Sequence, residues 1–282
     1  MKFALIATAG ALAVASVSAS GPLSYPEFLV KTSMAAAIAK SAQEEGTIFK
    51  PLILGGTEVP AGEKLWTVGL RSSETSSNYC GGTLITPKHV LTAAHCFGAI
   101  THASIGSRFL NGSKDGERIK VSKQTSHPDY NTSTSSNDFM ILELATASKV
   151  TPVKLKTTEP AVDTTATVNG WGFTSQGGSQ PTIQLQVDVP IVSDASCAAT
   201  LDITPATMIC AGGKANQDSC QCDSGGPLTI KSGSDNIQVG VVSWGIGCGL
   251  DGYPGVYASV PSAKSWIDAT LKGTGYNATW VA

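Results

Sequence analysis

The stretch CGGTLITPKHVLTAAHC, from Cys80 to Cys96, contains a run of strand length, HVLTAA, and closes with a histidine beside a cysteine. From Ile53 onward the sequence continues in the same texture, with short runs of Val, Ile, Thr and Leu separated by Gly, Asn, Asp, Ser and Pro. The first group of residues favours strands and the second favours turns. The regular spacing of the runs therefore predicts an all-β fold, either a sandwich or a barrel.

Further runs of strand length follow along the chain. They are RIKVSK at residues 118–123, DFMILEL at 138–144, TATVNGWG at 165–172, IQLQVDVPIV at 183–192, IQVGVVSWG at 237–245 and GVYASV at 255–260. One helix is expected in residues 261–271, PSAKSWIDATL, because the apolar residues of this stretch fall on one stripe. The polar, proline-containing residues 151–164 are interpreted as a linker between two β units.

The N-terminus has the residue order of a secretory signal. A lysine, an apolar run and then small residues lead to a plausible cleavage site after Ala19, so residues 1–19 are interpreted as a signal peptide and the alternative is a short anchor. No later apolar run reaches the roughly 18 residues that a membrane span needs. We therefore expect a secreted, extracellular protein.

Residues 20–52 contain no cysteine and no strand pattern. Their centre predicts a short helix, with Phe28, Leu29, Met34 and Ile38 on or near one face. This segment is interpreted as a removable pro-segment, and the alternative is a disordered spacer. Residues 53–282 then form the mature domain.

The net charge and the hydrophobic content limit the kinds of molecule that we expect the protein to bind. The formal net charge of -2 provides no basic stripe for nucleic acid and no polybasic arm for a membrane surface. The 41% of hydrophobic residues is enough for a large core. We therefore expect neither nucleic acid nor a membrane as a partner, and we also expect no cofactor and a monomer.

Three chemically suited residues follow one another in the order His95, Asp138 and Ser224. A serine hydroxyl is a weak nucleophile at neutral pH, so it needs a base within hydrogen-bond reach and an anion that orients that base. Each residue alone is weak evidence, because a histidine beside a cysteine is often a packed core residue. Together they suggest nucleophilic catalysis.

Several blocks of sequence, in order, resemble the signature blocks of the chymotrypsin and trypsin-like serine proteases. They are CGGTLITPKHVLTAAHC, SHPDYN, NDFMILEL, GWG, CDSGGPL, SWGIGCG and PGVY. The resemblance implies two antiparallel six-stranded β-barrels with a C-terminal helix and an active site in the cleft between the barrels. It also implies that Ser224 is the nucleophile, His95 the general base and then acid, and Asp138 the group that holds the imidazole.

The resemblance also implies a disulfide framework, which cysteine counting alone leaves open. The implied pairs are Cys80 with Cys96, Cys197 with Cys210, and Cys220 with Cys248. Cys222 is left over. It stands where relatives almost always have glycine, at a position whose amide, with that of Ser224, forms the oxyanion hole.

A substrate pocket for Arg or Lys is implied by Asp218, six residues before Ser224, together with Gly245 and Gly255 in the pocket walls. The alternative is that Asp218 is an ordinary loop acid. Relatives are cut just before an isoleucine whose new ammonium pairs with a buried aspartate, which here implies Ile53 and Asp223. Leu52 precedes Ile53 where relatives usually have Lys or Arg, so the activating cut needs another enzyme or another site.

Cys222 is the second departure from the family pattern. Its side chain would strain a backbone that suits glycine and crowd the leaving-group side of the cleft, which affects long substrates and protein inhibitors first. The alternatives are a thiol tolerated by drift, or one that competes with Cys220 for Cys248.

The remaining features concern glycosylation, the other histidines and metal binding. Acceptor tripeptides for N-glycans occur at Asn111, Asn131 and Asn277. His89, His102 and His127 fall outside the matching catalytic positions and are interpreted as surface or packing residues. No metal site is expected, since Ser107 stands where calcium-binding relatives have a carboxylate.

Two interpretations of function remain. The first is a secreted, trypsin-like endopeptidase made as a zymogen, which cleaves protein or peptide substrates after Arg or Lys and meets protein inhibitors. The second is a weakly active or inactive homologue that binds a target protein, because GGTEVPAGEKLWTVGL and FLNGSKDGE are similar to stretches of the secreted glucanase inhibitor proteins. Those homologues have lost triad residues, whereas this chain keeps all three.

Overall fold

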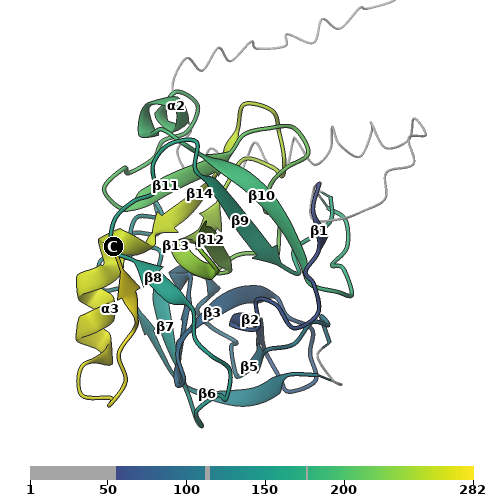
Figure 1. The fold of residues 1–282 in the computed structure, drawn as a ribbon, viewed down its shortest axis with the longest axis vertical. Coiled ribbons are helices and arrows are strands. Elements are labelled where there is room, and N and C mark those ends of the chain that lie inside the picture. The colour runs from purple at the N-terminus through teal and green to yellow at the C-terminus, as the bar shows by residue number, and fades with distance from the viewer. Residues whose placement is uncertain (1–54, 112–114, 176) are drawn as a thin grey trace, which may run out of the picture.

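The computed structural model of the protein describes residues 55–111, 115–175 and 177–282. The segments interpreted as a signal peptide (1–19) and a pro-segment (20–52), together with Ile53, lie outside the described residues. Two β-barrels stack on each other, with a helix at the C-terminal end beside them (Figure 1). The expected fold of two six-stranded antiparallel barrels with a C-terminal helix is confirmed.

The first barrel is closed in the order β2-β3-β4-β7-β6-β5. Its strands are β2 (Thr67–Arg71), β3 (Cys80–Thr86), β4 (His89–Thr92), β5 (His102–Ile105), β6 (Glu117–Ser126) and β7 (Met140–Leu144). A short 3-10 helix, η1 (Ala94–Cys96), follows β4 directly. Because β4 pairs with β7 and Thr92 lies opposite Met140, the residues just beyond these two positions come together at one end of the barrel.

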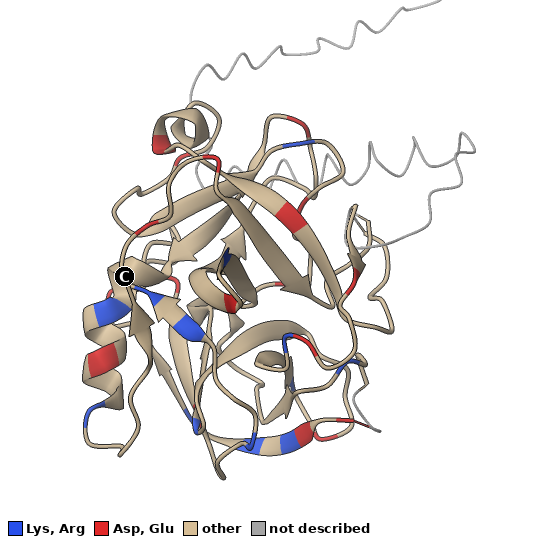
Figure 2. Ribbon diagram, in the orientation of Figure 1, with Lys and Arg blue, Asp and Glu red and all other residues tan. Residues whose placement is uncertain are grey.

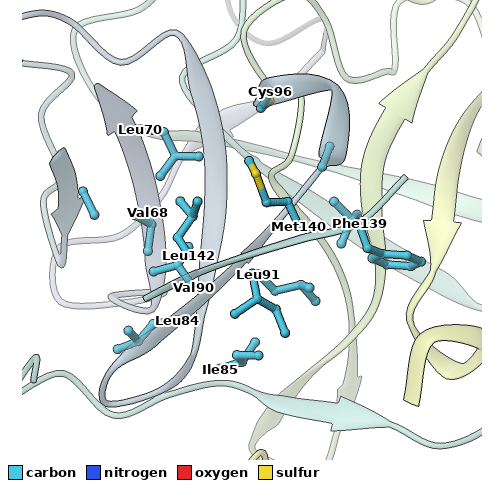
Figure 3. Close-up of a cluster of buried hydrophobic side chains, with 14 of the residues drawn as sticks. Val68, Leu70, Leu84, Ile85, Val90, Leu91, Cys96, Phe139, Met140 and Leu142 are labelled. Carbon is cyan, nitrogen blue, oxygen red and sulfur yellow. The ribbon is translucent and has the colours of Figure 1, made fainter. Parts of the chain in front are cut away.

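Aliphatic side chains fill this barrel. Val68, Leu70, Leu84, Val90 and Leu142 are fully buried and share the face of their paired strands that points into the interior (Figure 3). Each such side chain contributes roughly 1.5 to 3 kcal/mol when it is removed from water. The apolar runs recognised in the sequence therefore form the core that holds the end of β4 rigidly in place.

The second barrel closes through β12, which pairs with both β9 and β13. Its strands are β9 (Thr165–Gly170), β10 (Leu185–Val192), β11 (Met208–Gly212), β12 (Pro227–Ser232), β13 (Asp235–Trp244) and β14 (Pro254–Ser259). Val168, Leu228 and Val239 are among the side chains of its core. Each of the seven strand runs predicted from the sequence overlaps one strand of the two barrels.

Short elements connect and flank the barrels. They are β1 (Thr57–Glu58), β8 (Lys154–Lys156), α2 (Asp194–Ala198), η2 (Val260–Ala263), α3 (Lys264–Leu271) and β15 (Trp280–Val281). Residues 151–164 run between β7 and β9, but they also contribute β8, which pairs in parallel with β13 and β15. The α-helix at the end begins at Lys264, three residues later than expected, because η2 occupies the residues before it. Within the described ranges no helix combines the length and the apolar character that crossing a membrane requires.

Candidate active site

His95 and Asp138 meet at the end of the first barrel. His95 is held by η1, and Asp138 stands two residues before β7. The imidazole Nδ1 and the Asp138 Oδ2 are 2.7 Å apart, and the backbone amide of His95 donates to Oδ1 at 2.9 Å. The fully buried carboxylate of Asp138 therefore fixes both the ring and the backbone of the histidine.

The electrostatics of this pair favour a basic imidazole. Burial lowers the pKa of His95, but the negative charge of Asp138 and the hydrogen bond to it raise the pKa more, and the net shift is upward. Such a group accepts a proton more readily than a free histidine does. The arrangement suits a general base.

Ser224 lies in the loop that leads from β11 to β12 of the second barrel, and this loop touches the first barrel. Its carbonyl accepts a hydrogen bond of 2.7 Å from the amide of Gly81, and the next residue, Gly225, donates to Val242 at 2.8 Å. A side chain at Gly225 would overlap Thr92, so only glycine permits this close approach. Ser224 and His95 line one cavity of about 220 Å³.

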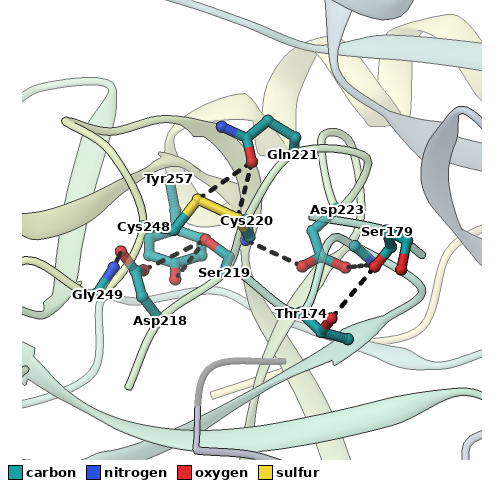
Figure 4. Close-up of a disulfide and its surroundings, with 11 residues drawn as sticks. Thr174, Ser179, Asp218, Ser219, Cys220, Gln221, Asp223, Cys248, Gly249 and Tyr257 are labelled. Carbon is teal, nitrogen blue, oxygen red and sulfur yellow. Dashed lines mark hydrogen bonds between the residues drawn. A yellow bond between two sulfur atoms is a disulfide. The ribbon is translucent and has the colours of Figure 1, made fainter. Parts of the chain in front are cut away.

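Asp218 lines the same cavity from the second barrel, with Gly245 and Gly255. Its carboxylate is 4% exposed and accepts hydrogen bonds from the Gly249 amide at 3.0 Å and the Ser219 hydroxyl at 3.5 Å (Figure 4). Burial raises the pKa of Asp218 to about 7. A side chain on Gly255 would press against Asp218, so the wall of the cavity stays open only with glycine there.

Cys222 occupies the left-handed region of backbone space, with a φ of 71°. Residues other than glycine visit this region at a cost of roughly 1 to 2 kcal/mol. Its thiol is free and half-buried, and burial and the nearby Asp223 raise its pKa to about 11. Within the described ranges, the backbone amides of Cys222 and Ser224 donate no hydrogen bond.

Asp223 directly precedes Ser224 in the same loop, and its side chain is buried. Its carboxylate accepts from the amides of Gly172 at 2.8 Å and Cys220 at 3.1 Å, and among the residues the structure describes it has no cationic partner (Figure 4). Burial raises its pKa to about 6. Any side chain at Gly172 would collide with this carboxylate.

Three disulfides brace the two barrels. They join Cys80 to Cys96, Cys197 to Cys210, and Cys220 to Cys248, which are the pairs that the resemblance implies. Cys80–Cys96 ties η1 to β3, and the Cys220–Cys248 disulfide lines the cavity that contains Asp218. These two disulfides thus fix η1, which contains His95, and the loop that contains Asp218.

A family model described as Trypsin matches residues 53–267. The chain belongs to the trypsin family. The match spans both barrels and every candidate catalytic residue.

Relatives within the trypsin family carry two kinds of name. Glucanase inhibitor protein 2 of Phytophthora sojae is 39% identical over 253 residues, covering 84% of this chain and 85% of the relative. Glucanase inhibitor protein 3 of Phytophthora sojae (strain P6497) is 40% identical over 263 residues, covering 86% and 99%. Trypsin beta of Drosophila erecta is 38% identical over 226 residues, covering 76% and 87%.

Ser243 is a residue of this trypsin-family site that sequence reasoning missed. Its hydroxyl donates a 2.5 Å hydrogen bond to Asp138 Oδ2, from the second barrel to the first. Ser243 opens the SWG block, but that block indicates only the pocket position of Gly245 and does not indicate a contact with Asp138. Gln180 was also missed, and its side-chain amide bridges the barrels by donating to the carbonyls of Asn78 and Trp171.

The remaining candidate residues lie away from the cavity. His89 is buried against Thr86, His102 bonds to Thr101, and His127 packs on Trp266. Ser107 donates to Asp115 at 2.7 Å, and the described residues contain no group of three or more His, Cys, Asp or Glu able to hold a metal. The three glycan acceptors are exposed, namely Asn111, Asn131 and Asn277.

Proposed function

We propose that this protein is a secreted serine endopeptidase that cleaves after Arg or Lys. The observation that carries the proposal is the convergence of the His95–Asp138 pair, Ser224 and Asp218 on one cavity. The disulfides and the predicted signal peptide support export to an oxidising compartment.

Catalysis would follow the family mechanism. Ser224 Oγ attacks the substrate carbonyl while His95 takes the serine proton, and Asp138 stabilises the imidazolium that results. The unpaired amides of Cys222 and Ser224 then donate to the developing oxyanion. His95 then gives the proton to the leaving amine, and an acyl-enzyme remains on Ser224. Water next attacks this acyl-enzyme while His95 takes its proton, and release of the carboxylic acid regenerates Ser224.

Specificity would come from Asp218. A buried carboxylate with few donors is an unfavourable charge until a cation reaches it, and the guanidinium or ammonium of a substrate supplies that cation. The walls at Gly245 and Gly255 leave room for a long side chain. Ser219 and Gly249 hold the carboxylate in position.

Activation would depend on Asp223. After a cut before Ile53, the new ammonium would pair with this buried carboxylate and stabilise the loop that carries Cys222 and Ser224. Leu52 at the cut implies an activating protease that accepts leucine, or another cut site. Glycans at Asn111, Asn131 and Asn277 belong to the same proposal.

A fluorophosphonate probe, which reacts only with an activated serine, tests the enzymatic role. In a protein that begins at Ile53 we expect labelling of Ser224, lost in Ser224→Ala and His95→Ala and retained in Ser219→Ala, the matched serine in the same cavity. Absence of label in that correctly processed protein would rule the proposal out.

A second candidate function is supported by the names of the relatives. Six glucanase inhibitor proteins match at 37 to 40% identity over at least 84% of this chain. Under this candidate the protein binds a glucanase, and its fold serves as a rigid binding surface. We would measure inhibition of a panel of purified endoglucanases by the Ser224→Ala variant. Unchanged glucanase activity and no complex on gel filtration would eliminate this candidate.

A further inference from the structure

A second cavity, of about 260 Å³, lies where the residues between the barrels pass the end of β10 and the start of α2. We call it the linker groove and define it by Glu159, Val162, Ile191, Val192, Asp194 and Ile209. It shares no lining residue with the active-site cavity. Any ligand that it binds is therefore separate from the substrate in the catalytic cleft.

The linker groove combines an apolar floor with acidic edges. Val162 is 53% exposed, an unusual exposure for an aliphatic side chain, and it lies beside the buried Ile191 and Ile209. Glu159 and Asp194 provide two carboxylates, and no Lys or Arg lines the groove. Figure 2 shows acidic and no basic colouring on α2.

Neither carboxylate has a basic partner within the described residues. Glu159 accepts only a neutral hydrogen bond, from the Ser259 hydroxyl at 2.8 Å. The chemistry suited to such a surface is an apolar segment that carries a lysine, because a lysine stem packs on apolar atoms while its ammonium reaches the carboxylates.

Residues 20–52 of this chain contain such a segment. Lys31 stands three residues after Phe28 and three before Met34, so in the helix predicted for this region the three side chains share one face. We propose that residues 20–52 dock in the linker groove, with Phe28 and Met34 on the apolar floor and Lys31 between Glu159 and Asp194.

The connection between the two parts of the chain is long enough. β1 pairs with the start of β10, where Glu58 lies opposite Leu185, and the linker groove begins at the other end of the same strand. The eight residues of β10 span about 24 Å. The residues from Thr32 to Gly55 span roughly 36 Å even if all are helical, and more if extended.

Docking at this place has a consequence for processing. A cut before Ile53 would leave the pro-segment bound to the second barrel without a covalent link. Its departure would then be a separate step, set by the affinity of the linker groove and weakened by salt, because the contact includes a charge pair near solvent.

A zero-length carbodiimide crosslink between amine and carboxylate tests the docking in the full-length chain. The chain carries Ser224→Ala, so that it cannot cut itself and Lys31 is not consumed as a cleavage site. We expect Lys31 to link to Glu159 or Asp194 at least tenfold more often than to the matched control Asp129, an exposed carboxylate that also has no Lys or Arg partner among the described residues. Scattered links from Lys31, or no links, would overturn the proposal.

Isotope-mixed chains and a charge swap complete the test. Light and heavy chains mixed before crosslinking should give links within one chain only, and links between chains would assign the linker groove to a second copy and overturn the proposal. Lys31→Glu should abolish the link, and adding Asp194→Lys should restore it with the amine and carboxylate exchanged. Asp218→Ser should leave the link unchanged, and its loss there would mean that Lys31 occupies the catalytic pocket instead.

Discussion

Asp138 and Asp218 are two buried carboxylates beside one cavity, but their partners differ. Asp138 accepts two hydrogen bonds from His95 and one from Ser243, so its acceptor positions are filled by the protein. Asp218 accepts from the Gly249 amide and from the Ser219 hydroxyl at 3.5 Å, and a backbone hydrogen bond from Ser219 also lowers its pKa against the larger effect of burial. The first carboxylate has three donors from the protein, whereas the second has no cationic partner among the described residues.

This difference separates two tasks that carboxylates perform in one site. A group that holds the base must not move during the reaction, and three donors fix its position. A group that selects substrate gains affinity when its charge is poorly compensated without ligand. Variants that change only one of the two carboxylates should therefore have different kinetic signatures.

The largest effect is expected from Asp138→Asn. The amide cannot stabilise the imidazolium and favours the wrong tautomer of His95, so kcat should fall by about 10,000-fold, as in relatives with this substitution. KM for an Arg peptide should change little, because Asp138 lies outside the substrate pocket. Steady-state kinetics on a peptide amide measure both constants, and a change carried mainly by KM would contradict the assignment.

The next largest effect is expected from Asp218→Ser. Loss of the pocket charge should lower kcat/KM for Arg and Lys peptides by about 100- to 1000-fold, which corresponds to roughly 3 to 4 kcal/mol. The rate of fluorophosphonate labelling should stay close to that of the parent, since the serine and its base are untouched. A parent enzyme that prefers Phe or Leu before the scissile bond would overturn the role of Asp218.

The pH dependence should also distinguish the two carboxylates. The pKa of Asp218 is raised to about 7 by burial, so raising the pH from about 6 to about 8 ionises it and should lower KM for Arg peptides about tenfold. The raised pKa of His95 should appear instead as an acid limb in kcat, above the value of free histidine. A substrate with a neutral residue in the pocket is the control, and an equal fall of its KM would refute the assignment to Asp218.

The smallest effect is expected from Cys222→Gly, in the loop that carries both Asp218 and Ser224. Glycine relieves a φ of 71° and removes the thiol that would crowd a long substrate in the proposed mechanism, so kcat/KM for long peptide amides should rise about fivefold. The rise should be smaller for small esters. Alkylation of the parent thiol should act in the opposite direction, and equal rates in all three forms would make the cysteine a bystander.

The sequence alone predicts those candidate residues and strands that lie in recognisable local motifs. The blocks around His95, Asp138 and Ser224 could be read because each contains several diagnostic neighbours, and the strand runs could be read because aliphatic residues and turn residues alternate regularly. The hydrogen bond from Ser243 could not be read, since it crosses 105 positions between barrels and depends on how these pack.

Other features depend on backbone geometry or on distant neighbours. The positive φ of Cys222 was a conditional expectation, because a cysteine in a glycine position does not reveal whether the loop has adjusted to it. The linker groove joins Glu159 with Asp194, which are 35 residues apart and have no shared motif. α2 is only five residues long, too short for a periodic pattern to predict.

The pairing of β1 with β10 sets the reach of any terminus created at Ile53. Thr57 lies opposite Gln186, so such a terminus is four residues from a fixed point and can extend at most about 14 Å from it. Confinement of this kind is equivalent to an effective concentration of millimolar or more for the new ammonium. If such an ammonium pairs with Asp223, a free dipeptide that mimics the terminus would have to exceed that concentration to replace it.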